Sequence, residues 1–387
     1  MRSFGSDVEL EIYSPQTAKA NQNYPISYEE WKQLANEKLE DGPYWYVAGG
    51  AGSGATMKAN RSAFDNYTIK PRMLQNVESR DLSITLLDSA YNTPLLLAPI
   101  GVQSIIHQEG ELASAKAASA MGVPYIASTA SSYTLEEIAS VMGDSPRWFQ
   151  LYWGKDNDFT KSLLKRAENS GYSALVVTLD TPLLGWREQD LKNAYLPFIN
   201  GIGIANYLSD EAFCSKLAKS PKEDIASAIQ YFFKIYSNPS LTWESLAFLR
   251  ENTKLPILLK GILHPEDALL AVEHGMDGII VSNHGGRQVD GSISALEALP
   301  NIVEQVGTSI PILMDSGIRR GSDIIKALSL GAKAVLLGRP YVYGLAVGGE
   351  EGVRRVIRNL LADLDLTLAL SGRQSIESLD RSVLHLK

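Results

Sequence analysis

The hydrophobic pattern of the chain becomes regular at about residue 95. From there, short apolar runs rich in β-branched residues alternate with longer segments whose apolar residues recur at helical spacing. The strand-like runs cover residues 95–101, 125–129, 148–152, 174–180, 257–261, 278–283, 312–317 and 334–340. The helix-like segments include residues 109–121, 135–141, 265–274, 322–330 and 352–361. Eight alternating β and α units predict an α/β protein built as a (β/α)8 TIM barrel.

Two segments do not follow this alternation. Residues 1–90 form an N-terminal helical segment in our prediction, because Ser27 and Glu30 have the spacing of a capping box before an apolar helical pattern. Within it, the polar residues 1–24 are expected to form an arm over the surface or against a neighbouring subunit. Residues 182–240, after the fourth strand, are too long for an ordinary connection and predict a lid over an active site. We expect residues 1–387 to form a single domain, since α/β barrels often use this much sequence.

Polar residues gather at one end of the predicted strands. In chain order, the C-terminal strand ends give Pro99-Ile100-Gly101, Ser128 with Thr129, Gln150 with Tyr152, Thr178 with Asp180, Lys260, Ser282 with His284, Asp315 with Gly317, and Gly338-Arg339. Residues with purely structural roles would be spread along the strands, whereas the active sites of such barrels lie at the C-terminal strand ends. The sequence therefore predicts a functional site at this mouth of the barrel.

The sixth strand leads into the most informative segment. His284 is followed by two glycines and by Arg287, so a base and an anion-binding group lie close together on one rim. That combination suits proton removal next to a carboxylate. Asp180 could orient the imidazole and stabilise its protonated form. Arg187 could grip the same carboxylate as Arg287.

Other mouth residues indicate a cofactor or a phosphate. Lys260 follows a buried apolar run and could act as a Schiff-base amine in an aldolase, or as a fixed positive charge beside an electron-accepting cofactor. The last two strands carry Asp315, Gly317, Arg319, Gly338 and Arg339, where barrels commonly bind phosphate. This ligand could belong to a sugar-phosphate substrate or to a flavin. Tyr46 and Tyr152 could donate hydroxyl hydrogen bonds to a substrate.

Composition narrows the classes of function. The formal net charge is −8 and the pI is about 5.3, which argues against a nucleic-acid or anionic-membrane partner. Cys214 is the single cysteine, and the five histidines show no ligand spacing, so we expect no metal site. No signal pattern or membrane-length apolar run is present in the sequence, and a cytoplasmic enzyme is expected.

Residues 282–288, Ser-Asn-His-Gly-Gly-Arg-Gln, resemble the signature of the FMN-dependent L-2-hydroxy-acid-oxidising enzymes, a family that includes glycolate oxidase, lactate oxidase and lactate 2-monooxygenase. The resemblance extends over about residues 28–379. Its supporting motifs are Tyr-Val-Ala-Gly-Gly at 46–50, Ala-Pro-Ile-Gly at 98–101, Trp-Phe-Gln-Leu-Tyr at 148–152, Thr-Leu-Asp-Thr at 178–181, Leu-Lys-Gly-Ile at 259–262, Asp-Ser-Gly-Ile-Arg-Arg-Gly at 315–321 and Leu-Gly-Arg-Pro at 337–340.

The resemblance implies a role for each mouth residue. His284 would be the catalytic base with Asp180 as its partner, and Lys260 would stabilise reduced FMN. Tyr46, Arg187 and Arg287 would hold the substrate carboxylate, and Tyr152 would contact the substrate hydroxyl. The remaining FMN-binding residues would be Pro99, Ile100, Gly101, Ser128, Gln150, Thr178, Ser282, Asp315, Gly317, Arg319, Gly338 and Arg339.

Finer features resemble one branch of the family. Gly101 stands where lactate oxidases have alanine, and both this position and the Gly185-Trp186-Arg187 run resemble lactate 2-monooxygenase. This implies oxidation of L-lactate by O2 to acetate, CO2 and water, with pyruvate retained under the lid. The alternative is an L-lactate oxidase that releases pyruvate and H2O2, and a Schiff-base aldolase is the alternative from a different class. A homo-oligomer, tetramer or octamer, is also expected.

Overall fold

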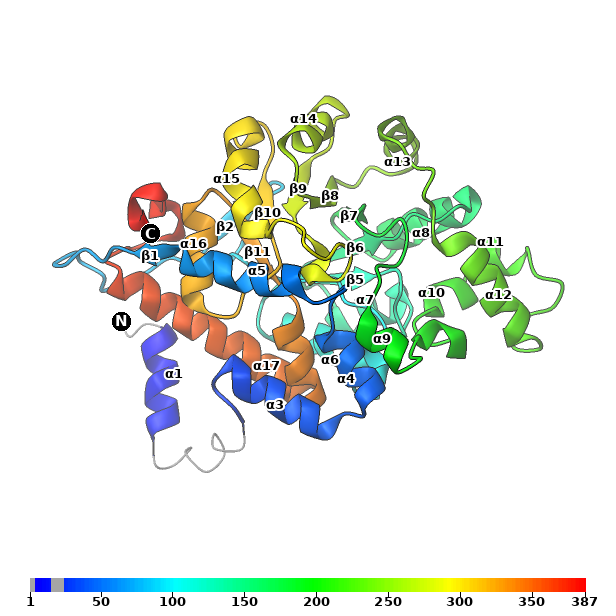
Figure 1. Ribbon diagram of the computed structural model, residues 1–387, viewed down its shortest axis with the longest axis horizontal. Helices are drawn as coiled ribbons and strands as arrows, with labels where there is room; N and C mark the ends of the chain where they lie inside the picture. Colours follow the sequence, from blue (N-terminus) through cyan, green and yellow to red (C-terminus); the bar gives the residue numbers. More distant parts are fainter. Residues whose placement is uncertain (1–3, 15–23) are drawn as a thin grey trace.

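The computed structural model describes residues 4–14 and 24–387, and eight parallel strands within these ranges close into a barrel (Figure 1). The strands are β4 (Leu95–Leu97), β5 (Tyr125–Ser128), β6 (Arg147–Leu151), β7 (Leu175–Thr178), β8 (Ile257–Ile262), β9 (Gly278–Val281), β10 (Ile312–Met314) and β11 (Ala334–Leu337). The barrel closes because β11 pairs with β4, with Leu336 opposite Leu96. Every strand overlaps one predicted run, so the (β/α)8 barrel is confirmed.

Several strands end earlier than the apolar pattern predicted. The run 95–101 gives a strand only to Leu97, and the run 334–340 only to Leu337. Beyond these points the backbone leaves the sheet to form the loops of the barrel mouth. Val102, for example, has a positive φ of 60°, which a strand cannot accommodate.

Helices surround the barrel on its outer face. They are α6 (Gly110–Ala120), α7 (Leu135–Met142), α8 (Asn157–Asn169), α13 (Leu246–Asn252), α14 (Pro265–Glu273), α15 (Ala295–Val306), α16 (Gly321–Ser329) and α17 (Arg339–Leu370). Local sequence explains where several of them begin, because Thr134 with Glu137 and Ser294 with Glu297 form complete capping boxes. The predicted helix 352–361 is only part of α17, which begins directly after β11 and is interrupted at Gly348 and Gly349.

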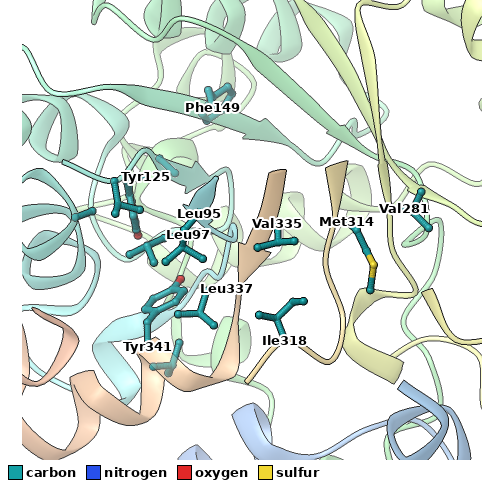
Figure 2. Packing of buried hydrophobic residues seen from close by; sticks show 14 of the residues in the cluster. Leu95, Leu97, Tyr125, Phe149, Val281, Met314, Ile318, Val335, Leu337 and Tyr341 are labelled. Atoms are coloured by element: carbon teal, nitrogen blue, oxygen red, sulfur yellow. The ribbon is translucent and has the colours of Figure 1, made fainter. Parts of the chain in front are cut away.

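Alternate residues of each strand face two different cores. In β4, Leu95 and Leu97 pack outward with residues such as Tyr341 of α17, as Figure 2 shows, while Leu96 points into the barrel. The inner core is a separate cluster of Leu86, Tyr91, Leu96, Ala98, Ile126, Trp148, Ala174, Val176, Leu258, Ile280, Leu313, Ala334 and Leu336. The barrel interior is therefore packed with side chains, and ligands must bind at one of its ends.

The N-terminal segment covers one side of the barrel. It contains α1 (Phe4–Tyr13), α3 (Tyr28–Lys38), α4 (Asp41–Ala48) and α5 (Ala55–Asp65), and the predicted capping box of Ser27 and Glu30 is confirmed at the start of α3. Part of the predicted arm is the helix α1, which packs against α17 of the same chain, as in Figure 1. The rest of the arm, residues 1–3 and 15–23, lies outside the described residues.

The segment is helical only as far as Asp65. After α5, the chain forms β1 (Tyr67–Ile69), which pairs with β12 (Leu384–Leu386) near the C-terminus, and the hairpin of β2 (Ile84–Leu86) and β3 (Ser89–Tyr91). Leu86 and Tyr91 of the hairpin join the inner core, with the Tyr91 ring 6.5 Å from that of Trp148. The hairpin thus closes the N-terminal end of the barrel, opposite the mouth.

The long connection after β7 is a folded layer of short helices. It contains α9 (Glu188–Lys192), the 3-10 helix η2 (Pro197–Asn200), α10 (Ala205–Leu208), α11 (Glu211–Cys214) and α12 (Ile225–Tyr236). An aromatic cluster holds the layer together and attaches it to α8, since the Tyr207 ring stacks on Phe159 at 4.4 Å and meets Phe232 edge-on at 4.8 Å. None of the helices in the described part of the chain is long and apolar enough to cross a membrane.

Candidate active site

A cavity opens at the C-terminal ends of the barrel strands, where the sequence predicted the site. It encloses about 1270 Å³ of space free of atoms, part of it open to solvent. The predicted residues that line it are Tyr46, Pro99, Ile100, Gly101, Tyr152, Arg187, Lys260, His284, Arg287, Asp315, Gly317, Arg319, Gly338 and Arg339. The other predicted residues, Ser128, Gln150, Thr178, Asp180 and Ser282, lie behind this lining and bond to it or to one another.

His284 and Asp180 form the pair that the sequence predicted. The Nδ1 atom of His284 lies 2.8 Å from Oδ1 of Asp180, which leaves Nε2 of the ring as the other polar position. His284 has a φ of 56°, and the two glycines that follow continue this left-handed conformation, so the imidazole turns toward the cavity immediately after β9. Oδ2 of Asp180 is buried without a hydrogen-bond partner among the described residues.

The electrostatic surroundings suit a neutral imidazole that accepts a proton. Burial lowers the pKa of His284 below its ordinary value of 6.5, and the positive charges of Lys260 and Arg187 act in the same direction against the opposing effect of Asp180. Burial alone would raise the pKa of Asp180, but His284 and Lys260 outweigh it and the net shift is downward. At neutral pH the pair is therefore a neutral imidazole held by a carboxylate.

Lys260 of β8 lines the cavity, and its ammonium group has two polar partners. Its Nζ atom donates to Oγ of Ser282 at 2.8 Å and forms an ion pair with Asp315 at 2.9 Å. Burial lowers the pKa of Lys260, but Asp315 and Asp180 outweigh that effect and raise it above the ordinary value. A lysine that stays protonated provides a fixed positive charge and does not suit the Schiff-base amine of an aldolase.

Two arginines and a tyrosine form one wall of the cavity. The guanidinium of Arg287 lies over the ring of Tyr46 at 5.2 Å and donates to the carbonyl of Gly49 at 3.1 Å. Arg187 donates to the carbonyl of Arg287 at 3.2 Å and to Oε1 of Gln288 at 3.0 Å. Burial and the neighbouring Arg187 lower the pKa of Arg287 to about 9, so Arg287 remains charged at neutral pH.

A chain of buried hydrogen bonds joins three neighbouring strands beneath the cavity. Oγ of Ser128 donates to Oε1 of Gln150 at 2.8 Å, and Nε2 of Gln150 donates to Oγ1 of Thr178 at 2.9 Å. The chain fixes the amide of Gln150, because its oxygen and its nitrogen each have a defined partner. The predicted residues of β5, β6 and β7 thus form one polar network.

Two arginines lie in the corner between β10, β11 and α17. Arg339 donates to the carbonyls of Val47, Gly49 and Gly285 at 2.8–2.9 Å, and the guanidinium of Arg319 lies over the ring of Tyr28 at 4.2 Å. Among the described residues, no carboxylate lies within ion-pair distance of either guanidinium. The Nε atom of Arg319 is buried and has no hydrogen-bond partner among the residues that the structure describes. Uncompensated positive charge beside glycine backbone is the usual composition of a phosphate site.

Some site residues were missed by the sequence analysis. Gln288 donates to the carbonyls of Asp180 and Leu183 and therefore connects the histidine pair to the lid segment. It was part of the quoted motif, but nothing in its residue type indicated that role. Leu183, Leu184, Phe198 and Tyr236 of the lid also line the cavity, and no local pattern placed them there.

The fold and the site together define a (β/α)8 barrel with a histidine–aspartate pair, two arginines beside a tyrosine, and a second arginine pair around one cavity. The model of the family "FMN-dependent dehydrogenase" matches residues 35–386. An L-lactate oxidase of Lysinibacillus sphaericus (strain C3-41) is 47% identical over 92% of both chains, and an L-lactate oxidase of Nostoc sp. is 44% identical over 94% of this chain and 98% of its own. A crystal structure of mandelate oxidase has a TM-score of 0.83 at 37% identity, covering 94% of this chain and 98% of that one.

The chain belongs to the FMN-dependent dehydrogenase family. It is an FMN-dependent oxidoreductase that oxidises 2-hydroxy acids, as the resemblance of its motifs implied. The residues present fit FMN: Arg319 and Arg339 offer charge to a phosphate, and protonated Lys260 offers charge to an electron-rich ring. Within the described residues, no group of three or more histidine, cysteine, aspartate or glutamate side chains could hold a metal ion.

Proposed function

We propose that this enzyme oxidises L-lactate, or a similarly short L-2-hydroxy acid, with O2, and that it releases pyruvate and H2O2. The observation that carries the proposal is the placement of the His284–Asp180 pair and of the Arg187–Arg287 wall around one cavity. The two L-lactate oxidases among the relatives support lactate as the substrate.

Substrate orientation follows from the wall. The carboxylate would bind Arg287 and Arg187, with the hydroxyl of Tyr46 as a further donor. Tyr152, whose ring lies 5.7 Å from that of Tyr236, would donate to the substrate's C2 oxygen. Burial raises the pKa of Tyr152 strongly, so its hydroxyl keeps its proton and serves as a hydrogen-bond donor.

His284 would accept a proton from the substrate at Nε2. The hydrogen bond from Nδ1 to Asp180 fixes the ring, and the carboxylate stabilises the imidazolium that forms. Bound FMN would supply a two-electron acceptor for the hydroxy acid and a two-electron donor for O2. Ser128, Gln150, Thr178 and the backbone of residues 99–101 would hold its ring, and Lys260 would stabilise negative charge on it.

The other FMN contacts would come from the last two strands and their loops. Asp315 and Ser282 are already fixed by Lys260 and would hold the ribityl chain and the ring edge. Gly317, Arg319, Gly338 and Arg339 would bind the phosphate.

A second candidate is lactate 2-monooxygenase, in which retained pyruvate reacts with the peroxide to give acetate, CO2 and water. The segment predicted as a lid favours this candidate, because its residues Leu183, Leu184, Phe198 and Tyr236 line the cavity with largely apolar surface. Gly101, however, also has a steric explanation: a Cβ atom there would clash with the carbonyl oxygen of Ala130. The glycine therefore carries less weight for monooxygenation than the sequence alone suggested.

The product balance with L-lactate in air tests the proposal. Oxygen uptake, H2O2, pyruvate and acetate are followed together in the holoenzyme. Peroxide and pyruvate formed in step with oxygen uptake support the oxidase, whereas acetate with little free peroxide supports the monooxygenase. If anaerobic L-lactate leaves the bound FMN oxidised, both candidates are wrong. The cytoplasmic location and the homo-oligomer remain predictions.

A further inference from the structure

Asp190 of helix α9 lies between the two arginines of the carboxylate-binding wall. Its Oδ2 atom is 3.9 Å from Nη1 of Arg187 and 3.9 Å from Nη2 of Arg287. The side chain is only 13% exposed, and Oδ1 is buried without a hydrogen-bond partner among the described residues. A buried carboxylate with an unpaired oxygen costs free energy, so a compensating role is expected.

The distances show how Asp190 acts on the arginines. At 3.9 Å, an N···O contact is too long for a hydrogen bond but short enough for a strong charge interaction. The carboxylate therefore attracts both guanidinium groups without occupying the N–H donors that a substrate needs. An aspartate in direct contact would instead accept hydrogen bonds from the N–H groups that a substrate carboxylate needs.

The charges of Arg187, Arg287 and Asp190 then sum to zero with the charge of a substrate that has a single carboxylate. Arg187 and Arg287 supply two positive charges, and ionised Asp190 cancels one of them. A substrate with a single carboxylate neutralises the other. Burial raises the pKa of Asp190, and Arg287 followed by Arg187 opposes that shift by favouring the ionised form.

We infer that Asp190 is a positioning residue that lowers the net charge of the wall from two to one, and that its charge thereby disfavours dicarboxylates, relative to monocarboxylates, compared with the same wall without that charge. The inference rests on the proposed carboxylate-binding function of Arg187 and Arg287. Asp190 also connects this selection to the lid, because α9 packs against α4, the helix that carries Tyr46.

The inference is tested by anion binding to the holoenzyme, followed by the change in the visible absorbance of bound FMN. Acetate serves as the monocarboxylate and oxalate as the dicarboxylate. Asp190→Asn removes the charge at almost constant shape and should shift the ratio of the two dissociation constants about tenfold toward oxalate. Asp190→Glu restores the charge and should restore most of the ratio. Glu188→Gln removes the same charge from the exposed face of α9 and should leave the ratio unchanged.

The outcomes are separable from those of the proposed function, because anion binding requires no turnover. A wild-type enzyme that binds acetate but is not reduced by lactate contradicts the proposed substrate and leaves the test of Asp190 intact. A ratio that is the same within twofold in wild type and Asp190→Asn overturns the inference. If Asp190→Asn fails to retain FMN, Asp190→Thr, which also removes the charge, gives the same comparison, and an unchanged ratio there is equally decisive.

Discussion

Replacing Asp180 with asparagine should slow FMN reduction by lactate while leaving the fold and the cofactor in place. The substitution keeps the shape of the side chain and removes the charge that lies 2.8 Å from Nδ1 of His284. During proton transfer that charge becomes the partner of an imidazolium. A hydrogen bond to a charged group contributes about 1.5–3 kcal/mol. A charge pair at about 4 Å contributes up to about 4 kcal/mol at an effective dielectric constant of 20.

These contributions set the size of the effect. A loss of about 2–4 kcal/mol of transition-state stabilisation corresponds to a rate decrease of roughly 30- to 1000-fold. The measurement is anaerobic mixing of the holoenzyme with L-lactate, with the FMN absorbance followed in time. Asp365→Asn is the matched control, because this buried aspartate pairs with Arg80 at 2.8 Å and does not line the cavity. It should lower the melting temperature without slowing reduction of the FMN that remains bound.

The pH profile gives a second and independent signature. In the proposed mechanism the neutral imidazole is the active form, so kcat/KM should rise with pH through the pKa of His284, which burial places below 6.5, and level off above it. Asp180 opposes that lowering. In Asp180→Asn, kcat/KM should therefore rise at still lower pH than in the wild type, and its value at the plateau should be smaller. If the plateau value of kcat/KM in Asp180→Asn is within threefold of wild type, or if kcat/KM rises at higher pH than in the wild type, the proposed role of Asp180 is refuted.

Three further substitutions probe other parts of the site. Lys260→Met leaves Asp315 buried and unpaired, so it should destabilise the protein by about 3–5 kcal/mol and lower its FMN content, as measured by thermal melting and absorbance. Arg287→Lys replaces a planar fork with a point charge and should lower kcat/KM for L-lactate at least tenfold in steady-state assays, and an unchanged value would count against bidentate binding. Gly101→Ala forces the backbone away from the carbonyl of Ala130 and should lower stability by about 1–3 kcal/mol, which thermal melting with intact FMN would detect.

The barrel could be predicted because its signals are local. Each strand is a short apolar run beside a turn residue, and the capping box of Ser27 and Glu30 lies within a few residues of the helix that it begins. The mouth residues could be predicted for a related reason. A parallel barrel brings all C-terminal strand ends to one rim, so residues as distant as Asp180 and His284 meet without any long-range signal.

Features that depend on distant partners could not be predicted in this way. The pairing of β1 with β12 joins Thr68 to His385, and neither three-residue strand has a pattern of its own. The hairpin of β2 and β3, which closes the N-terminal end of the barrel, could not be predicted for the same reason. Asp190 looks like an ordinary exposed charge in the sequence of a short polar helix. Its position between two arginines appears only when α9 folds onto the mouth.

The segment predicted as a lid also carries part of the proposed carboxylate-binding wall. Arg187 is the N-cap residue of α9, and Tyr236, which lines the cavity, ends α12 of the same segment. The aromatic cluster around Tyr207 fixes that segment to α8 and so to the barrel. In the proposed function, binding of the substrate carboxylate and retention of pyruvate therefore both depend on how this segment packs against α8. Any substitution that loosens the cluster should weaken carboxylate binding and let pyruvate escape more readily, even though it touches neither the substrate nor FMN.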